Sequence, residues 1–217
     1  MYIQDKEEWE YHRKTFGEHT KFGYKDFIQM FQAEKFDPKQ WAKLFKAAGA
    51  KYVFPVAEHH DGVQMYKSEI SKYNAFDMGP KRDLLGELRE AIEEENLMFG
   101  SGIVEVERGA LADPKPFVWQ TDTAIAKNSW CYTDTLEYKT SRQIICNFIE
   151  IISKNGNMLL NVGPKGDGEI PEEDQRILRE IGMWMEKECS LRLWQIKKNI
   201  NSIIVSMESR MYFLEVD

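Results

Sequence analysis

Two adjacent histidines between two carboxylates are the residues whose types and spacing most suggest chemistry. In the stretch VAEHHDGVQMY, residues 56–66, Glu58 precedes His59 and His60, and Asp61 follows them. Imidazole and carboxylate groups can hold a metal ion, move a proton or hydrogen-bond a polar ligand. Neighbouring residues of a strand point to opposite faces, so one metal ion does not readily bind both histidines. We predict no metal site and favour a pair that grips a substrate; two structural histidines are the alternative.

Two glutamates form a second candidate for acid–base chemistry. Glu105 and Glu107 alternate with valines in the stretch IVEVE, so both lie on one face of a predicted strand. A like-charged neighbour raises the pKa of a carboxyl group, which favours a general acid near neutral pH. A solvated strand edge has the same residue pattern, and from the spacing alone it is the favoured interpretation.

The stretch WQTDT, residues 119–123, combines an aromatic ring with polar side chains in a predicted loop. Trp119, Gln120 and Asp122 together could bind the ring and the hydroxyl groups of a sugar, although a tryptophan is otherwise a core residue. The glycine-rich stretch LLNVGPKGDG lacks the GxxxxGK[ST] spacing, so we expect no phosphate-binding loop there.

An alternation of helices and buried strands is predicted to position these residues. A helix begins at Asp37 and ends at Gly49, and the apolar run 52–57 that follows is typical of a strand buried on both faces. The paired histidines then fall at the carboxyl end of that strand, where the sites of α/β proteins lie. The other predicted elements are a helix at 84–96, a strand-like stretch at 97–107, a helix at 138–154, a strand at 157–163 and a helix from Pro171. This alternation predicts an α/β fold, with irregular structure at 108–134 and no clear pattern after 186.

Composition argues against several other classes of protein. The chain has 217 residues, 42% hydrophobic and 30% charged, which suffices for one domain with a core. Its net charge of -7 argues against nucleic acid as a partner. Three cysteines show no metal or disulfide spacing, and no apolar run has the length of a membrane span. The charged first residues are unlike a signal peptide, so the chain as written is expected to be cytoplasmic.

Four longer stretches resemble the α-L-fucosidases of glycoside hydrolase family 29. They are FGYKDFIQMFQAEKFDPKQWAKLFKAAGAKYVFPVAEHHDGVQMY, NAFDMGPKRDLLGEL, ERGALADPKPFVWQTDTAIAKNSWCY and SKNGNMLLNVGPKGDGEIPEEDQRIL, and they follow the family's order over residues 9–186. The resemblance implies a (β/α)8 TIM-barrel-like domain and hydrolysis of terminal α-L-fucose from glycoconjugates with retention of configuration. It also implies a fucosylated glycan or fucoside as substrate, and no metal or organic cofactor.

The resemblance implies roles for particular residues as well. His59 and His60 are expected to hydrogen-bond sugar hydroxyls in the fucose pocket, and Trp119 is expected near the same pocket. Glu107 is the expected general acid/base, with Glu105 in reserve. Gln120 stands where other members of the family have a glutamate, and an amide cannot serve as the acid.

The chain departs from the family's pattern in what it lacks. It contains no Trp-Phe-Asp-Gly-like motif, which carries the family's nucleophile, and no His-Trp-Gly segment of the first barrel strand. Ser101 and Gly102 bridge a place where the family has several βα units. A full barrel usually takes about 250 residues. We therefore expect a partial barrel domain at 1–186 and a divergent tail at 187–217.

Two functions stay open from the sequence. The first is an α-L-fucosidase-family glycosidase, truncated and with impaired or lost catalysis. In that case Glu58, Asp61 or Asp122 has to replace the missing nucleophile, because a retaining enzyme needs two carboxyl groups. The second is a non-catalytic carbohydrate-binding remnant that holds fucose without cleaving it.

Overall fold

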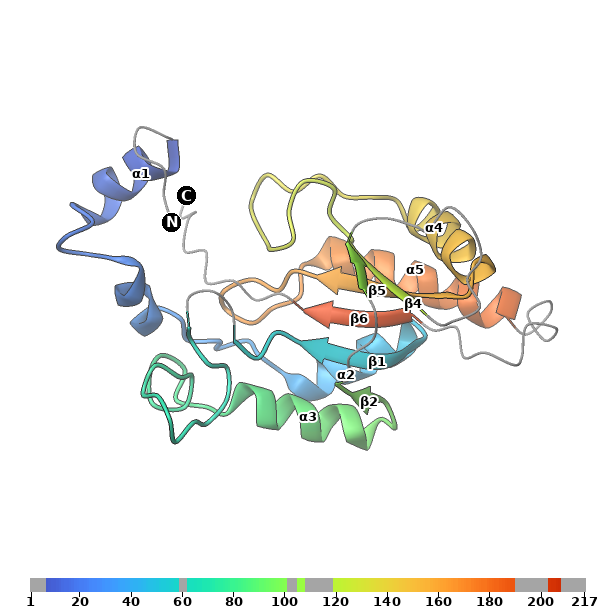
Figure 1. Ribbon diagram of the computed structural model, residues 1–217, viewed down its shortest axis with the longest axis horizontal. Helices are drawn as coiled ribbons and strands as arrows, with labels where there is room; N and C mark the ends of the chain where they lie inside the picture. The colour runs from blue at the N-terminus through green and yellow to red at the C-terminus, as the bar shows by residue number, and fades with distance from the viewer. Residues whose placement is uncertain (1–6, 59–61, 101–104, 108–118, 190–202, 208–217) are drawn as a thin grey trace.

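Six parallel strands form one sheet in the computed structural model, which describes residues 7–58, 62–100, 105–107, 119–189 and 203–207 (Figure 1). The strands are β1 (Ala50–Pro55), β2 (Met98–Phe99), β3 (Glu105–Glu107), β4 (Trp119–Ala124), β5 (Gly156–Val162) and β6 (Ile203–Met207). In space they follow the order β2-β1-β6-β5-β4-β3, and every neighbouring pair is parallel.

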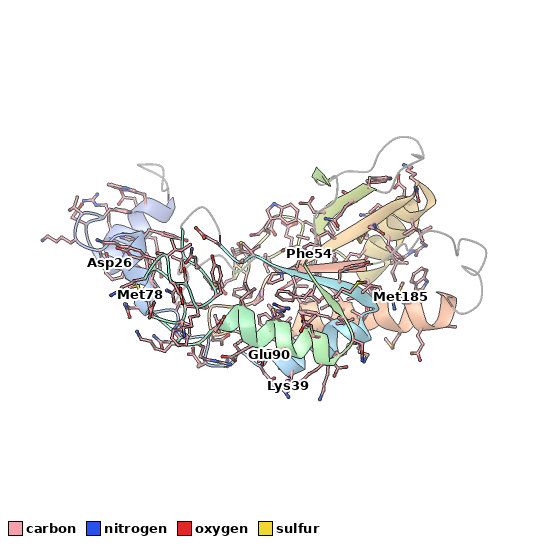
Figure 2. The ribbon with its side chains drawn as sticks, turned by 60° about the horizontal axis from the view of Figure 1, so that its bottom comes forward. Asp26, Lys39, Phe54, Met78, Glu90 and Met185 are labelled. Atoms are coloured by element: carbon pink, nitrogen blue, oxygen red, sulfur yellow. The ribbon has the colours of Figure 1, made fainter. Side chains whose placement is uncertain are left out.

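Four helices pack against one face of this sheet. The described residues form the helices α1 (Glu7–Phe16), the 3-10 helix η1 (Tyr24–Gln29), α2 (Pro38–Ala47), α3 (Leu84–Glu94), α4 (Ser141–Ser153) and α5 (Glu172–Cys189). Buried apolar side chains of α2, α3, α4 and α5 form one core with strand residues such as Val53 and Leu160. Both of these pair with Val205 of β6, so they lie on the same face. Helix α1 lies apart from the sheet (Figure 1, Figure 2). It contacts η1 through Phe16 and Phe27, whose ring centroids are 4.9 Å apart.

The strand order places the first strand beside the last. Strands β3, β4, β5 and β6 follow one another across the sheet in sequence order, and β6 then pairs with β1, which is followed by β2. A (β/α) barrel joins its first and last strands in the same way. The edges are β2 and β3, which do not pair in the described residues. The α/β class predicted from the sequence is confirmed, but the strands that the structure describes do not close into a barrel.

The short connection between β2 and β3 requires a curved sheet. The chain from Phe99 to Glu105 spans at most about 22 Å, whereas six strands in a flat sheet would place its two edges about 24 Å apart. The chain must also return from the carboxyl end of β2 to the amino end of β3. The sheet therefore curls toward closure. Because four helices cannot fit inside so small a curl, the face without them is the concave one.

Helix α2 begins and ends as predicted. The Asp37 carboxylate accepts hydrogen bonds from the backbone N–H groups of Lys39 and Gln40, both at 3.0 Å. Pro38 occupies the first helical position, where its missing N–H costs nothing. Gly49 adopts φ +85°, a conformation that suits glycine, and turns the chain directly into β1.

Strands β4 and β6 lie where the sequence analysis predicted no strand, and the predicted strand-like stretch 97–107 forms two separate strands. The stretch WQTDT, predicted as a loop, forms most of β4; one face of this strand is polar, which hides the apolar run expected of a buried strand. The residues after 186 contribute β6 between β1 and β5. The stretch 97–107, predicted as one strand-like unit, is split into β2 and β3 at opposite edges of the sheet.

A glycine in the middle of α5 lets this helix approach α2 closely. A Cβ atom at Gly182 would lie 1.9 Å from the carbonyl oxygen of Ala47. Because a helix backbone cannot move aside locally, we expect Gly182→Ala to lower the free energy of unfolding by about 2–3 kcal/mol in urea titrations. The control is Glu186→Ala, at an exposed position of the same helix. Unchanged stability of Gly182→Ala would contradict the close contact of the two helices.

Candidate active site

The carboxyl end of β1 leads into the stretch that holds the paired histidines. His59, His60 and Asp61 lie outside the described residues, so their predicted roles stay predictions. On either side of them, Glu58 and Gln64 form an antiparallel bridge, and the Gln64 amide donates a hydrogen bond to the Glu58 carboxylate at 3.0 Å. These two flanking residues are thus held together just beyond the end of β1.

A small apolar cavity lies beside this end of β1. It has a volume of about 60 Å³ and is lined by Phe31, Phe36, Trp41, Pro55, Met65 and neighbouring side chains. Ligand pockets usually measure about 300–1,000 Å³, whereas this volume accommodates about two water molecules. The cavity is therefore a packing gap and not a sugar pocket.

Trp119 is a core residue of the described structure. Its side chain is 0% exposed and packs among the helix-side core residues, and its indole N–H donates to the Lys154 carbonyl at 2.8 Å. The residue also begins β4, so it lies at the amino end of the strand, opposite the edge at which the histidine stretch begins. Because of this face and this end, we correct the sequence-based expectation and leave Trp119 out of the sugar site.

The concave face of β4 and β5 carries polar side chains. Gln120 and Asp122 alternate with Trp119 along β4, so they lie on the face away from the helices. Gln120 is paired in register with Asn157 of β5, and Asn161 lies further along the same face of β5. Both asparagines and Gln120 are buried, while Asp122 is half-buried. Asp122 and Asn161 lie toward the carboxyl ends of their strands, where a barrel enzyme binds its ligand, whereas Gln120 and Asn157 lie nearer the amino ends.

One of these buried groups lacks a donor. The Oε1 atom of Gln120 has no hydrogen-bond partner among the described residues, although the side chain is only 5% exposed. By contrast, the Asn161 side-chain amide donates to the Trp130 carbonyl at 2.5 Å. A buried carbonyl oxygen without a donor costs about 1–3 kcal/mol. Gln120 is therefore suited to accept a hydrogen bond from a polar ligand.

Strand β3 adds two carboxylate-bearing residues beside β4. Glu105 is paired in register with Gln120, and Glu107 with Asp122. Paired residues of neighbouring strands share a face and lie about 4.8 Å apart. The backbone therefore brings the predicted acid/base residue Glu107 next to Asp122. The side chains of β3 lie outside what the structure describes, so the catalytic roles of Glu107 and Glu105 stay predictions.

A buried carboxyl group that the sequence analysis missed lies behind the carboxyl end of β5. Asp174, in the first turn of α5, is 3% exposed. Burial raises the pKa of Asp174 to about 6. Hydrogen bonds from the Tyr138 hydroxyl and the Gly163 amide act in the opposite direction and lower this pKa. Burial and the nearby carboxylate also raise the pKa of Tyr138. Asp174 follows two other acidic residues in the sequence, so nothing in the pattern marks it as the buried one.

The described residues contain no group of three or more histidine, cysteine, aspartate or glutamate side chains that could hold a metal ion. In the same part of the chain, no helix combines the length and the apolarity needed to cross a membrane.

Parallel strands, outer helices and carboxylate-bearing residues on the concave face define a class of protein. This arrangement is typical of α/β-barrel glycosidases, in which carboxyl groups inside the strand ends act on a sugar. A sequence model of the family described as Alpha-L-fucosidase matches residues 1–106 and 101–190. The chain belongs to the alpha-L-fucosidase family. The two matched segments overlap at 101–106, which includes the first two residues of β3 and the place where the resemblance predicted missing βα units.

Relatives of known function agree with this assignment. Tissue alpha-L-fucosidase of Rattus norvegicus is 25% identical over 289 positions, which cover 85% of this chain and 62% of the rat protein. That alignment is longer than this chain, so the rat protein contains internal residues that this chain lacks. Plasma alpha-L-fucosidase of Homo sapiens is 25% identical over 264 positions, 76% of this chain and 56% of the human protein. The chain spans less than two thirds of the length of these relatives.

Solved structures show the same relationship. A Thermotoga maritima alpha-fucosidase in complex with fucose matches with a TM-score of 0.79 and 28% identity, over 87% of this chain and 64% of that protein. An alpha-L-fucosidase isoenzyme of Paenibacillus thiaminolyticus matches with a TM-score of 0.72 and 22% identity, over 77% of this chain and 67% of that one. The second match shows a likeness of fold alone.

Proposed function

We propose that this chain binds terminal α-L-fucose at the carboxyl edge of its sheet and hydrolyses α-L-fucosides with retention of configuration, at a low rate. The observation that carries the proposal is the family match on both sides of residues 101–106. The likeness to a solved alpha-fucosidase that holds fucose supports the same class of substrate. His59 and His60 are proposed to hydrogen-bond the sugar.

A partial (β/α)8 barrel is the proposed finer description of the fold. The pairing of β6 with β1 and the curl of the sheet support it. The proposed gap lies between β2 and β3, so a sugar on the concave face is open to water on that side. Water weakens the electrostatic interactions that stabilise a transition state. This accounts for the low rate in the proposal.

Substitution of the two histidines tests the proposed binding site. The wild type is expected to hydrolyse 4-nitrophenyl α-L-fucoside, and His59→Ala and His60→Ala are each expected to raise KM about tenfold, the loss of one hydrogen bond worth about 1.4 kcal/mol. The β-L-fucoside is the anomeric control and is expected not to react. Glu69→Gln, at an exposed position, is the control variant and should keep wild-type kinetics.

Calorimetric titration with L-fucose separates binding from turnover. Binding that His59→Ala weakens, without any turnover by the wild type, would support the second candidate function, a non-catalytic fucose-binding protein. Within the part of the chain that the structure describes, the two edge strands β2 and β3 do not pair, which favours that candidate. Absence of both binding and turnover, in a protein that circular dichroism shows to be folded, would overturn the proposal.

A further inference from the structure

We propose that Asp122 is the catalytic nucleophile of this chain and that Glu107 is its acid/base partner. The inference rests on the proposed hydrolysis of α-L-fucosides. Asp122 would supply the nucleophilic carboxylate that the family carries in a Trp-Phe-Asp-Gly-like motif, which this sequence lacks. Retaining glycosidases hold their two carboxyl groups about 5–5.5 Å apart, one on each side of the bond that breaks.

The register of β3 and β4 brings the backbones of the two residues to a comparable separation. Glu107 and Asp122 are Cα partners in neighbouring parallel strands, which lie about 4.8 Å apart and turn paired residues to the same face. Glu105, the reserve acid/base residue, is paired with Gln120, whose amide is no nucleophile for this reaction. Of the three registered pairs between these strands, the pair of Glu107 and Asp122 alone joins two carboxyl groups.

The side chains of β4 show which face is open to a ligand. Trp119 and Thr121 are fully buried on the helix side, whereas Asp122 is half-buried on the concave side. On that same side, the buried Gln120 has an Oε1 atom that accepts no hydrogen bond among the described residues. A sugar hydroxyl beside Asp122 would supply the missing donor. This buried and unsatisfied group is an observation independent of the two carboxylates.

The other two replacements that the sequence allowed fit less well. Glu58 is exposed, accepts a hydrogen bond from Gln64, and follows β1, which lies four strand positions from β3 in the sheet. A pair separated in this way along the sheet does not have the spacing of a retaining enzyme. Asp61 lies outside the described residues. Asp122 is the candidate that the backbone register brings beside Glu107.

The reaction then runs in two balanced steps. The Asp122 carboxylate attacks the anomeric carbon of the α-L-fucoside while Glu107 gives its proton to the departing oxygen, and a β-linked fucosyl ester of Asp122 forms. Water then attacks the same carbon, gives a proton to Glu107 and releases the Asp122 carboxylate. The anomeric carbon is inverted twice, so the product keeps the α configuration.

Covalent trapping with 2-deoxy-2-fluoro-α-L-fucosyl fluoride tests the role of Asp122. The fluorine slows breakdown of the ester, so the peptide that contains Asp122 should gain the mass of one fluorofucosyl group. Asp122→Asn should remove the label and lower kcat by about a thousandfold or more. Glu150→Gln, at an exposed position of α4, is the control and should keep both the covalent label on Asp122 and the wild-type kcat. Circular dichroism checks that each variant is folded.

Azide distinguishes the two roles by stereochemistry. With Asp122→Gly, azide can take the place of the nucleophile and should give β-L-fucosyl azide through one inversion. With Glu107→Gly and an activated aryl fucoside, azide should take the place of water in the second step and give α-L-fucosyl azide. The reverse products would exchange the two roles and overturn the assignment.

The outcomes separate this inference from the proposed function. Turnover that survives Asp122→Asn, or a label on Glu58 or Asp61, would overturn the role of Asp122 and leave α-L-fucoside hydrolysis standing. A wild type that neither turns over nor takes the label would overturn both the nucleophile and the hydrolysis, whatever the calorimetric binding of fucose. A label on Asp122 together with β-L-fucosyl azide would support the inference.

Discussion

A chain that ends after Cys189 is expected to lose its cooperative fold, because it lacks β6. This strand is registered with β1 at five positions and with β5 at five. Its removal leaves the facing N–H and C=O groups of two central strands without partners, at a cost of about 1 kcal/mol or more for each buried group. A domain is stable by only about 5–15 kcal/mol in total. Urea unfolding followed by circular dichroism should show no cooperative transition.

Two controls separate the loss of β6 from the shortening of the chain. A chain that ends after Met207 keeps the strand and should unfold cooperatively. In the full chain, Val205→Pro removes a backbone donor in the centre of the sheet and should destabilise strongly, whereas Val205→Thr keeps both the donor and the branched Cβ. An unchanged unfolding midpoint for the chain ending after Cys189 would contradict the central position of β6.

Between pH 4 and pH 7, the buried Asp174 carboxyl group is expected to lower the free energy of unfolding of the wild type by about 3 kcal/mol, and Asp174→Asn is expected to abolish this loss. The pKa of Asp174 is about 6 in the folded protein and 3.8 for an unperturbed aspartate. Below about pH 4 the group is protonated in both states, whereas above about pH 6 the folded protein must hold a buried charge. Its stabilising contribution is therefore greatest below pH 4 and is lost as pH rises through 6.

Urea unfolding of the wild type and Asp174→Asn at several pH values measures this difference. The free energy of unfolding of the wild type, minus that of the variant, should fall as the pH rises from 4 to 7. The titration of other groups affects both proteins alike and cancels in this difference. Tyr138→Phe removes the hydroxyl that donates to the carboxylate and should steepen the decline. The control Met183→Ala, at an exposed position of α5, changes no titrating group and should show a constant difference. A constant difference for Asp174→Asn would show that its carboxyl group does not titrate in a buried site.

The elements with one clear period were predictable. Helices α2 to α5 and strand β5 lie within about three residues of their predicted bounds, since an apolar stripe or a buried run identifies each of them. Strand β4 was missed because Gln120 and Asp122 make one of its faces polar. Strand β6 was missed because the sequence of its five residues carries too weak a strand pattern. Its pairing with β1 and β5, and not its own sequence, determines that it is a strand.

The candidate site was predictable in its residue types and not in its geometry. The sequence alone singles out Glu107 and Asp122, but the fourteen residues between them hide that the two residues are neighbours in the sheet. It also proposes Trp119 for the sugar, since spacing does not tell on which face of the sheet a residue lies. The buried Asp174 carries no signal in the sequence, because its partners Tyr138 and Gly163 come from segments that only the tertiary fold brings to the start of α5.

By itself the sequence determined the family, the α/β alternation and the local starts and ends of the helices, because caps, glycines and apolar periods act over a few residues. The tertiary structure alone decided that β6 lies between β1 and β5, that β2 and β3 form the edges, and that Glu107 is registered with Asp122. Strand order and register depend on hydrogen bonds between residues far apart in the chain, and these bonds form only when the whole sheet is assembled.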